Sequence, residues 1–206
     1  MTSILKVSEI QDPTNSNTAL TVGSNGGVTI NTTAIKDASG TNTALTIDSA
    51  GIITNSVPVG FSAKLQANQS DILNATYTKV EMTSTGAYDF DTHNGWSNTD
   101  YYYTVPANCA GYWMLTAQAE FDVMGTSNLI IISKTATVGD AAYWIAYHVE
   151  GQNTTASANP TPSITCMAYL NVGDIIKAEA RHNYGNTRNL IGASYLRTFM
   201  QGWRLF

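Results

Sequence analysis

Apolar and polar residues alternate through the middle of the chain, between residues 113 and 123. One side of the alternation holds Trp113, Leu115, Ala117, Ala119, Phe121 and Val123, and the other holds Thr116, Gln118, Glu120 and Asp122. A period of two residues predicts an antiparallel strand with one buried face. The aromatic run at 101–105 predicts an earlier strand that ends at Pro106, and Gly111 permits a turn. We therefore expect these two strands to pair as a hairpin.

The pattern predicts more strands on both sides of this region, beginning with a short one at 79–82. Residues 129–132 are a continuous apolar run, which is typical of a central strand buried on both faces. Alternating or aromatic stretches at 143–150, 164–170, 175–180 and 194–206 are separated by turn residues. No stretch has a sustained helical period. About eight to ten strands with regular turns predict an all-β, antiparallel sandwich of the jelly-roll type over residues 57–206.

The first 56 residues carry an internal repeat with an offset of 25 residues. Asn-Thr-Ala-Leu-Thr-Val at 17–22 recurs as Asn-Thr-Ala-Leu-Thr-Ile at 42–47, and Gly26 recurs as Gly51. Each unit predicts a small hairpin with too little apolar surface to stand alone. Because repeat units normally need three or more stacked neighbours, we expect other copies of the chain to supply them. Residues 1–56 are thus predicted to be an oligomeric β arm; the alternative is a Thr/Asn/Ser-rich tail, but apolar residues kept in register favour the arm.

Composition and charge narrow the functional classes. Charged residues are only 12% of the chain and the net charge is -5, whereas nucleic-acid binding needs clustered Lys and Arg. No apolar run reaches the ~18 residues of a membrane span, and no signal peptide precedes the head. We therefore expect no nucleic acid, no membrane and synthesis in a cytoplasm. The spacing of Cys109 and Cys166 fits no metal motif, and buried thiols are favoured over a disulfide.

Residues 61–206 carry five short motifs in the order of a known head domain. They are Phe-Ser-Ala at 61–63, Gly-Ala-Tyr-Asp at 86–89, Tyr-Thr-Val-Pro-Ala at 103–107 with Gly-Tyr-Trp at 111–113, Leu-Asn-Val-Gly-Asp-Ile-Ile at 170–176, and Gly-Trp-Arg-Leu-Phe at 202–206. This order resembles the globular domain of the complement first-component q family, which is related to tumour-necrosis-factor heads. The resemblance implies a jelly roll that packs as a homotrimer around a threefold axis.

The N-terminal segment resembles a different class of protein. Ser-Ile-Leu-Lys-Val at 3–7, Ile-Gln-Asp at 10–12 and the Thr-Ala-Leu-Thr repeats are similar to virion appendage proteins of tailed bacteriophages. That resemblance implies an arm through which the trimer is fixed to a capsid or tail protein of the particle.

Few residues are candidates for chemistry or ligand binding. Asp89, Asp91 and His93 are spaced so that an extended strand would place all three on one face, which makes them weak metal candidates against a solvated polar edge. No Ser or Cys lies in a nucleophile elbow, so we expect no enzyme and no cofactor. Trp96 lies in the polar loop 91–100 and is the candidate receptor contact.

These observations favour a structural virion protein. The leading hypothesis is a homotrimeric capsid-decorating or cement spike whose residues 1–56 dock on the particle. Even fully extended, 56 residues reach roughly 190 Å, so a long receptor-seeking shaft is not available. The alternative is a short tail fibre whose head binds a host surface carbohydrate, and a depolymerising enzyme is a third hypothesis.

Overall fold

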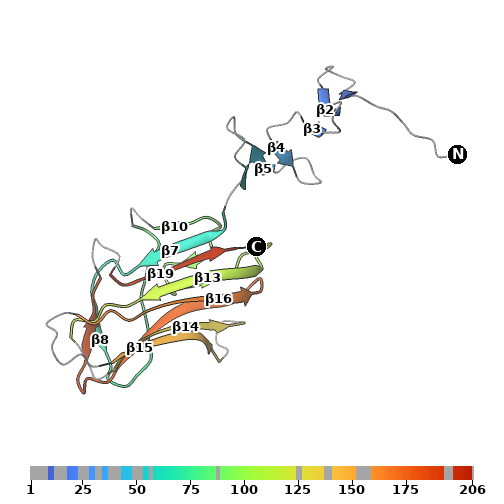
Figure 1. Ribbon diagram of the computed structural model, residues 1–206. Coiled ribbons are helices and arrows are strands. Elements are labelled where there is room, and N and C mark those ends of the chain that lie inside the picture. Colours follow the sequence, from blue (N-terminus) through green and yellow to red (C-terminus); the bar gives the residue numbers. More distant parts are fainter. Residues whose placement is uncertain are drawn as a thin grey trace. The chain divides into compact units, whose positions relative to one another are not determined.

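The chain divides into two units, Met1–Val57 and Pro58–Phe206 (Figure 1). The computed structural model describes residues 58–86, 89–123, 127–136, 141–151, 159–192 and 197–205, and in the first unit the backbone of six strands. The sequence predicted a boundary after residue 56. Within the described residues, no helix has the length and apolarity needed to cross a membrane.

The first unit contains two sheets of three strands that repeat each other. The strands are β1 (Glu9–Gln11), β2 (Thr18–Val22), β3 (Val28–Ile30), β4 (Ala34–Lys36), β5 (Thr43–Ile47) and β6 (Ile53–Asn55). Leu20 pairs with Ile10 and Ile30 in one sheet, and Leu45 pairs with Ile35 and Asn55 in the other. The 25-residue repeat thus has three strands in each unit. The two-strand hairpin predicted from the sequence omitted β1 and β4.

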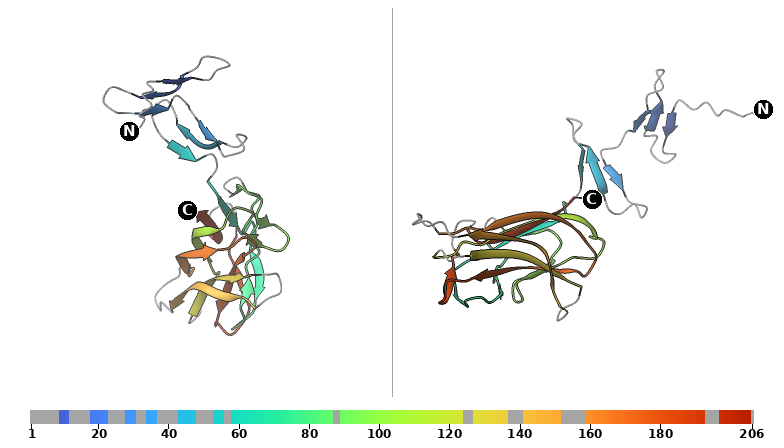
Figure 2. Two further views of the ribbon diagram at one scale, coloured as in Figure 1. Left: turned by 90° about the vertical axis from the view of Figure 1, so that its right-hand side faces the viewer. Right: turned by 60° about the horizontal axis from the view of Figure 1, so that its bottom comes forward.

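The second unit, which we call the head, contains two antiparallel sheets that face each other (Figure 1 and Figure 2). The first sheet has the order β10-β7-β19-β13-β16, with bounds Phe90–Asp91, Gly60–Lys64, Phe199–Arg204, Gly111–Gln118 and Ser163–Leu170. The second has the order β11-β12-β17-β14-β15, with bounds Trp96–Ser97, Tyr102–Thr104, Ile175–His182, Ser127–Thr135 and Tyr143–Gly151. Three shorter strands complete the described part of the head: β9 (Thr78–Lys79) pairs with β17, and β8 (Gln69–Ile72) pairs with β18 (Arg188–Leu190).

Two strand predictions are confirmed. β13 alternates buried and more exposed residues along its whole length, as the period of two requires. β14 pairs with β15 on one side and with β17 on the other, so the apolar run at 129–132 does lie in a central strand. The alternation ends before Val123, which is exposed.

The predicted hairpin at 101–123 is wrong. β12 pairs with β11 and β17 in the second sheet, whereas β13 pairs with β16 and β19 in the first. The connection crosses between the sheets, with the side chains of Val105 and Cys109 buried in the core. The backbone nitrogen of Val105 donates to the carbonyl oxygen of Asp174, and its carbonyl oxygen accepts from the nitrogen of Gly173, each at 2.9 Å. These bonds take the place of pairing with β13. Pro106 and Gly111 therefore mark a change of sheet and not a tight turn.

Three aromatic rings join the two sheets at the centre of the core. Phe61 of β7 stacks on Tyr103 of β12 with ring centroids 4.1 Å apart, and Tyr103 lies 5.5 Å from Trp113 of β13. All three side chains are fully buried. Burial, followed by the nearby Asp91 charge, raises the pKa of Tyr103. This aromatic column is packed so closely that some of its neighbours must be small.

Gly202 of β19 is the smallest of those neighbours. A Cβ atom at this position would lie 2.4 Å from Cε1 of Phe61 and 2.9 Å from Cδ2 of Leu115, which is closer than atoms can pack. We expect Gly202→Ala to destabilise the head by about 1–3 kcal/mol through overpacking, measured as a shift in the urea midpoint. Gly151→Ala is the matched control, because a Cβ there meets nothing within 4 Å and should change stability little. Equal effects of the two substitutions would contradict this packing.

Candidate functional site

Trp96 does not form the exposed receptor contact predicted from the sequence. Its side chain is only 9% exposed, its Nε1 donates to the carbonyl oxygen of Met82 at 3.2 Å, and its ring lies 5.4 Å from Phe61. The polar residues around Trp96 suggested an exposed position. The Asp91 carboxylate, however, accepts a hydrogen bond from the backbone nitrogen of Trp96 at 2.7 Å. This hydrogen bond holds the loop in place, and the Trp96 indole lies in the core of the head.

The three metal candidates do not share one strand face. β10 ends at Asp91 and the chain turns over residues 92–94, so the extended spacing assumed for the site is lost before His93. Oδ2 of Asp89 accepts from the Gly86 nitrogen at 2.6 Å, and Nδ1 of His93 contacts the Thr92 hydroxyl at 2.9 Å. Among the residues that the structure describes, no three His, Cys, Asp or Glu side chains are grouped as metal ligands would be. The carboxylates of Asp89 and Asp91 instead accept hydrogen bonds from backbone nitrogens of the loops in which they lie.

The two cysteines do not form a disulfide. Cys109 is buried beside the aromatic column, and Cys166 is partly buried on β16. Burial raises the pKa of both thiols. A thiol with a raised pKa is a poor nucleophile at neutral pH.

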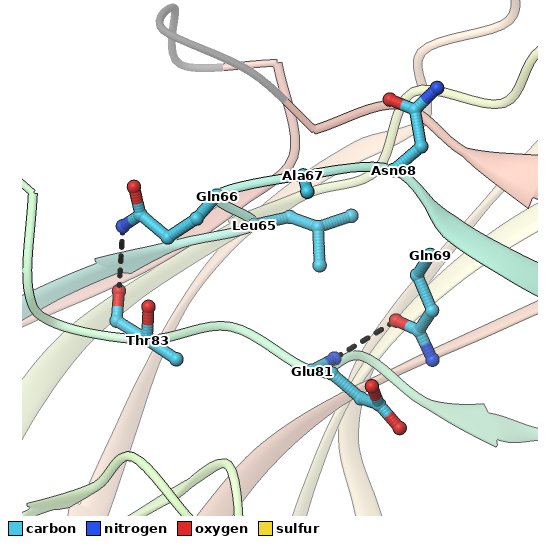
Figure 3. Close-up of a pocket in the computed structure, with 7 residues that line it drawn as sticks. All are labelled: Leu65, Gln66, Ala67, Asn68, Gln69, Glu81 and Thr83. Atoms are coloured by element: carbon cyan, nitrogen blue, oxygen red, sulfur yellow. Dashed lines mark hydrogen bonds between the residues drawn. The ribbon is translucent and has the colours of Figure 1, made fainter.

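A small hollow lies between the segment 65–69 and the segment 81–83 (Figure 3). Its volume is about 170 Å³, and its lining residues are Leu65, Gln66, Ala67, Asn68, Gln69, Glu81 and Thr83. The amide of Gln69 accepts from the Glu81 nitrogen at 2.9 Å and donates to the Lys79 carbonyl oxygen at 3.0 Å, and Gln66 donates to the Thr83 carbonyl oxygen at 3.4 Å. Because the wall amides are used in joining the two segments, the hollow offers few groups to a ligand.

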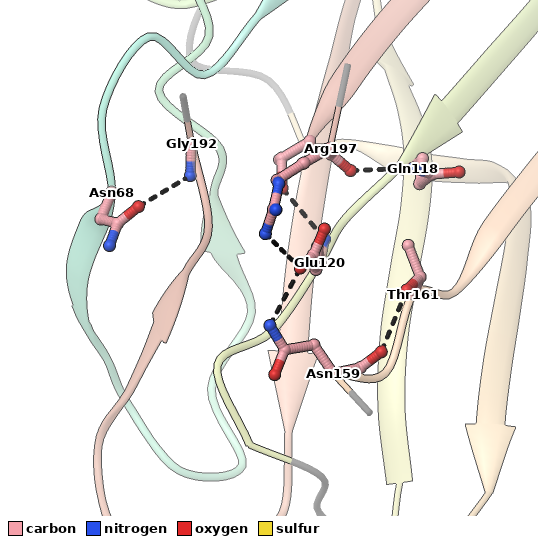
Figure 4. Close-up of polar contacts among 8 residues, drawn as sticks. Asn68, Gln118, Glu120, Asn159, Thr161, Gly192 and Arg197 are labelled. Carbon is pink, nitrogen blue, oxygen red and sulfur yellow. Dashed lines mark hydrogen bonds and ion pairs between the residues drawn. The ribbon is translucent and has the colours of Figure 1, made fainter. Parts of the chain in front are cut away.

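One polar cluster joins several loops around Glu120 (Figure 4). Oε1 of Glu120 accepts from Arg197 and from Asn159, each at 2.9 Å, and its backbone nitrogen donates to Thr198 at 3.0 Å. Gln118 adds a bond to the carbonyl oxygen of Arg197 at 2.9 Å. The cluster thus ties the segments that contain Asn159 and Arg197 to the end of β13, and these contacts already satisfy the carboxylate oxygen that faces them.

A buried ion pair holds the turn between β16 and β17. Nζ of Lys134, at the end of β14, contacts Oδ2 of Asp174, which also accepts from the Asn171 nitrogen at 2.7 Å. Burial alone would lower the pKa of Lys134, but the hydrogen bond and charge of Asp174, with a contribution from Tyr143, raise it overall. Removing one partner would leave a buried charge unpaired, so the intact ion pair keeps this turn in place.

An exposed apolar surface of the first sheet lies on β13 and β16. Tyr112 and Met114 are each 42% exposed, Met167 is 63% exposed and Tyr169 is 52% exposed. The strand register places Met114 opposite Met167 and Tyr112 opposite Tyr169, whose rings lie 5.2 Å apart. We call these four side chains the β13/β16 face. Sequence reasoning missed it, although the unbroken apolar run from 112 to 115 was a signal that both faces of this strand are apolar.

The second sheet carries a separate exposed cluster of aromatic residues. Tyr77, Trp144 and Tyr147 are 44%, 46% and 56% exposed. The ring of Trp144 lies 5.1 Å from Tyr77 and 5.9 Å from Tyr147. We call these three side chains the aromatic cluster. Tyr77 could not be found from the sequence, because it is a single aromatic residue in a polar stretch.

Comparisons with known proteins identify the fold of the head. The sequence matches no protein-family model and no curated protein. Among solved structures, an Eiger TNF from S. frugiperda has a TM-score of 0.54 at 8% identity, covering 72% of this chain and 93% of that one. Murine APRIL has a TM-score of 0.54 at 15% identity, covering 72% of this chain and 100% of that one. The head has a TNF-like jelly-roll fold.

This similarity confirms the predicted jelly-roll fold. Because the sequence identities are low, the similarity shows the fold alone. The TNF-like head is an antiparallel all-β sandwich, as the alternation and the order of the five motifs predicted. The β13/β16 face and the aromatic cluster are exposed apolar surfaces on different sheets. They are therefore the candidate functional sites.

Replacing Trp96 tests whether its indole is a core group. We expect Trp96→Ala to lower the free energy of unfolding by about 3–5 kcal/mol, because it removes a large buried ring and leaves a cavity beside Phe61. Urea denaturation followed by circular dichroism measures the change. Leu73→Ala, at a position that is 54% exposed, is the control and should change stability little. A Trp96→Ala protein as stable as this control would show that the indole is not part of the core.

Proposed function

We propose that this protein is a non-enzymatic structural protein of a bacteriophage virion, and that it acts as a homotrimer. The observation that supports this proposal best is the β13/β16 face. Monomeric proteins rarely leave such contiguous apolar surface in water, and a second copy of the chain is the simplest partner to cover it. The resemblance of the head to TNF-type heads favours three copies around one axis.

The apolar surface continues beyond the β13/β16 face across the first sheet. Trp203 of β19 pairs with Met114, and Met114 pairs with Met167, so the three side chains form one row across neighbouring strands. Trp203 also lies 4.5 Å from the ring of Phe90 on β10. A surface of aromatic and Met residues without charged side chains has the composition of the centre of a subunit interface.

The repeated arm supports attachment to a particle. Each arm sheet has three strands of three to five residues. Such small sheets gain stability from neighbouring units, which other copies of the arm or a capsid protein would provide. Because the arm is short, we favour a capsid-decorating or cement protein that stabilises the shell by bridging neighbouring subunits.

A second candidate function is carbohydrate recognition by the head of a short tail fibre. With Trp96 buried, this function needs another surface. The aromatic cluster favours it, because its rings are about half exposed on the sheet opposite the β13/β16 face.

Charge substitutions on the β13/β16 face test the trimer. We expect the wild-type chain to have three times its 22.1 kDa mass in native mass spectrometry at micromolar concentration. Met167→Glu should weaken association by about 3–5 kcal/mol, because each contact would bury a carboxylate without a partner. Val172→Glu, at an exposed turn position, is the control. A wild-type monomer, or a Met167→Glu trimer as stable as the wild type, would contradict the proposal.

Location on an intact particle tests the structural role. Immunogold labelling of purified virions should place the protein over the capsid, and particles lacking it should lose DNA at a lower temperature than complete ones. Label confined to the tail would support the short-fibre candidate in place of the capsid role. Absence of the protein from purified particles would contradict both.

A further inference from the structure

The rings of the aromatic cluster contact one another and form one continuous surface. The Tyr77 and Trp144 rings meet edge-on at an interplanar angle of 61°, and the Trp144 and Tyr147 rings are tilted by 57°. Tyr77 precedes β9, whereas the other two side chains belong to β15, so the cluster joins opposite edges of the second sheet. Contacts between the rings restrict their rotation, which lowers the entropy lost when a ligand binds.

The residues beneath the cluster explain only part of its surface. Register places Tyr147 opposite Ile131 and Trp144 opposite Ser133, and both β14 residues are fully buried although they lie on the outer side of the sheet. The rings therefore cover the outer side of β14 with one part of their surface. The other part faces solvent, as the exposed fractions of about one half show.

The charged residues near the cluster are mostly basic. Lys177, Glu179 and Arg181 alternate with the core residues of β17 and so lie on the outer side of the sheet. Lys177 is paired with Glu179 at 3.1 Å. The guanidinium carbon of Arg181 lies 5.4 Å from the centre of the Tyr77 ring, and Arg181 forms no ion pair with any other residue that the structure describes. A guanidinium that has no ion pair among the described residues thus lies beside half-exposed rings.

This combination matches one class of ligand. Aromatic faces pack against the C–H faces of pyranose rings, and a guanidinium donates two parallel hydrogen bonds to a carboxylate. An acidic saccharide presents both groups on one sugar unit. Single-stranded nucleic acid also stacks on aromatic rings, but it needs a continuous basic groove. On this face the described residues place Lys177 in an ion pair with Glu179 and leave Arg181 and Lys79 without one.

We propose that Tyr77, Trp144, Tyr147 and Arg181 form a binding site for an acidic saccharide, in which the rings hold the sugar and Arg181 holds its carboxylate. This inference deepens the second candidate function and rests on it. The site does not depend on the β13/β16 face, because the two surfaces lie on different sheets.

Calorimetric titration of the full-length protein tests the site. The probes are trigalacturonate and its methyl ester, which has the same rings without the charge. The acid should bind with a millimolar to micromolar Kd, and the ester about tenfold more weakly, because it lacks the charge-assisted pair with Arg181. Arg181→Gln should bring the affinity for the acid down to that for the ester. Trp144→Ala should weaken binding of both probes about tenfold or more.

A similar pair elsewhere on the head provides a matched control. Arg188 lies 3.4 Å from the centre of the Tyr184 ring, which is 42% exposed, and among the described residues no ring contact joins Tyr184 to the aromatic cluster. Tyr184→Ala should leave the affinity for trigalacturonate unchanged. Native mass spectrometry of each variant reports the oligomer separately, so loss of sugar binding with an intact trimer is the expected result for Trp144→Ala.

Several results would overturn the site. They are absence of trigalacturonate binding at millimolar concentration, wild-type affinity in both Trp144→Ala and Arg181→Gln, and tighter binding of oligothymidylate than of the saccharide. Dissociation of the trimer by Trp144→Ala would show that the cluster is a subunit contact instead. A wild-type monomer that still binds the acid would contradict the trimer and leave the site standing.

Discussion

The contact between Phe61 and Tyr103 is the interaction on which the head depends. Phe61 belongs to the first sheet and Tyr103 to the second, and their stacked rings set the separation of the two layers. Trp113 extends the same column, and Gly202 is the small residue that lets Phe61 lie against β19. Once this column is buried, the outward side of every strand is decided by its period of two.

A filled core explains why the exposed apolar residues need a separate account. Tyr112 and Met114 alternate with Trp113 and Leu115 on one strand, so β13 has apolar residues on both sides near its start. Trp113 and Leu115 lie on the inner side of the strand and are part of the filled core of the head. The outer ones remain 42% exposed in one copy of the chain, and covering them by a neighbour is the physical basis of the proposed trimer.

Much of the fold could be predicted because burial imposes a period on the sequence. The alternation in β13 and the continuous run in β14 identified a half-buried and a central strand correctly. The hairpin failed because Pro106 and Gly111 show only that the chain turns. Which sheet receives the next strand depends on the distant bonds of Val105 with the turn at 173–174, and no local pattern encodes them.

The functional surfaces were harder to predict, because exposure is decided by tertiary contacts. Trp96 lies among polar residues, yet the hydrogen bond from its backbone nitrogen to the Asp91 carboxylate directs the ring into the core. Tyr77 and Trp144 are far apart in the sequence and meet only because β9 and β15 belong to one sheet. The candidate sites therefore come from the structure, whereas the sequence supplied the type of fold around them.

Methionine oxidation of the wild-type protein is the most direct test of the proposed interface. Met82 and Met200 are fully buried within one copy of the chain and provide internal references, whereas Met114 and Met167 are 42% and 63% exposed there. If neighbouring copies cover the β13/β16 face, peptide mass spectrometry after peroxide treatment should show Met114 and Met167 oxidising as slowly as Met82 and Met200. Rapid oxidation of Met114 and Met167 beside intact reference residues would show that this face is open to water, and would contradict the account.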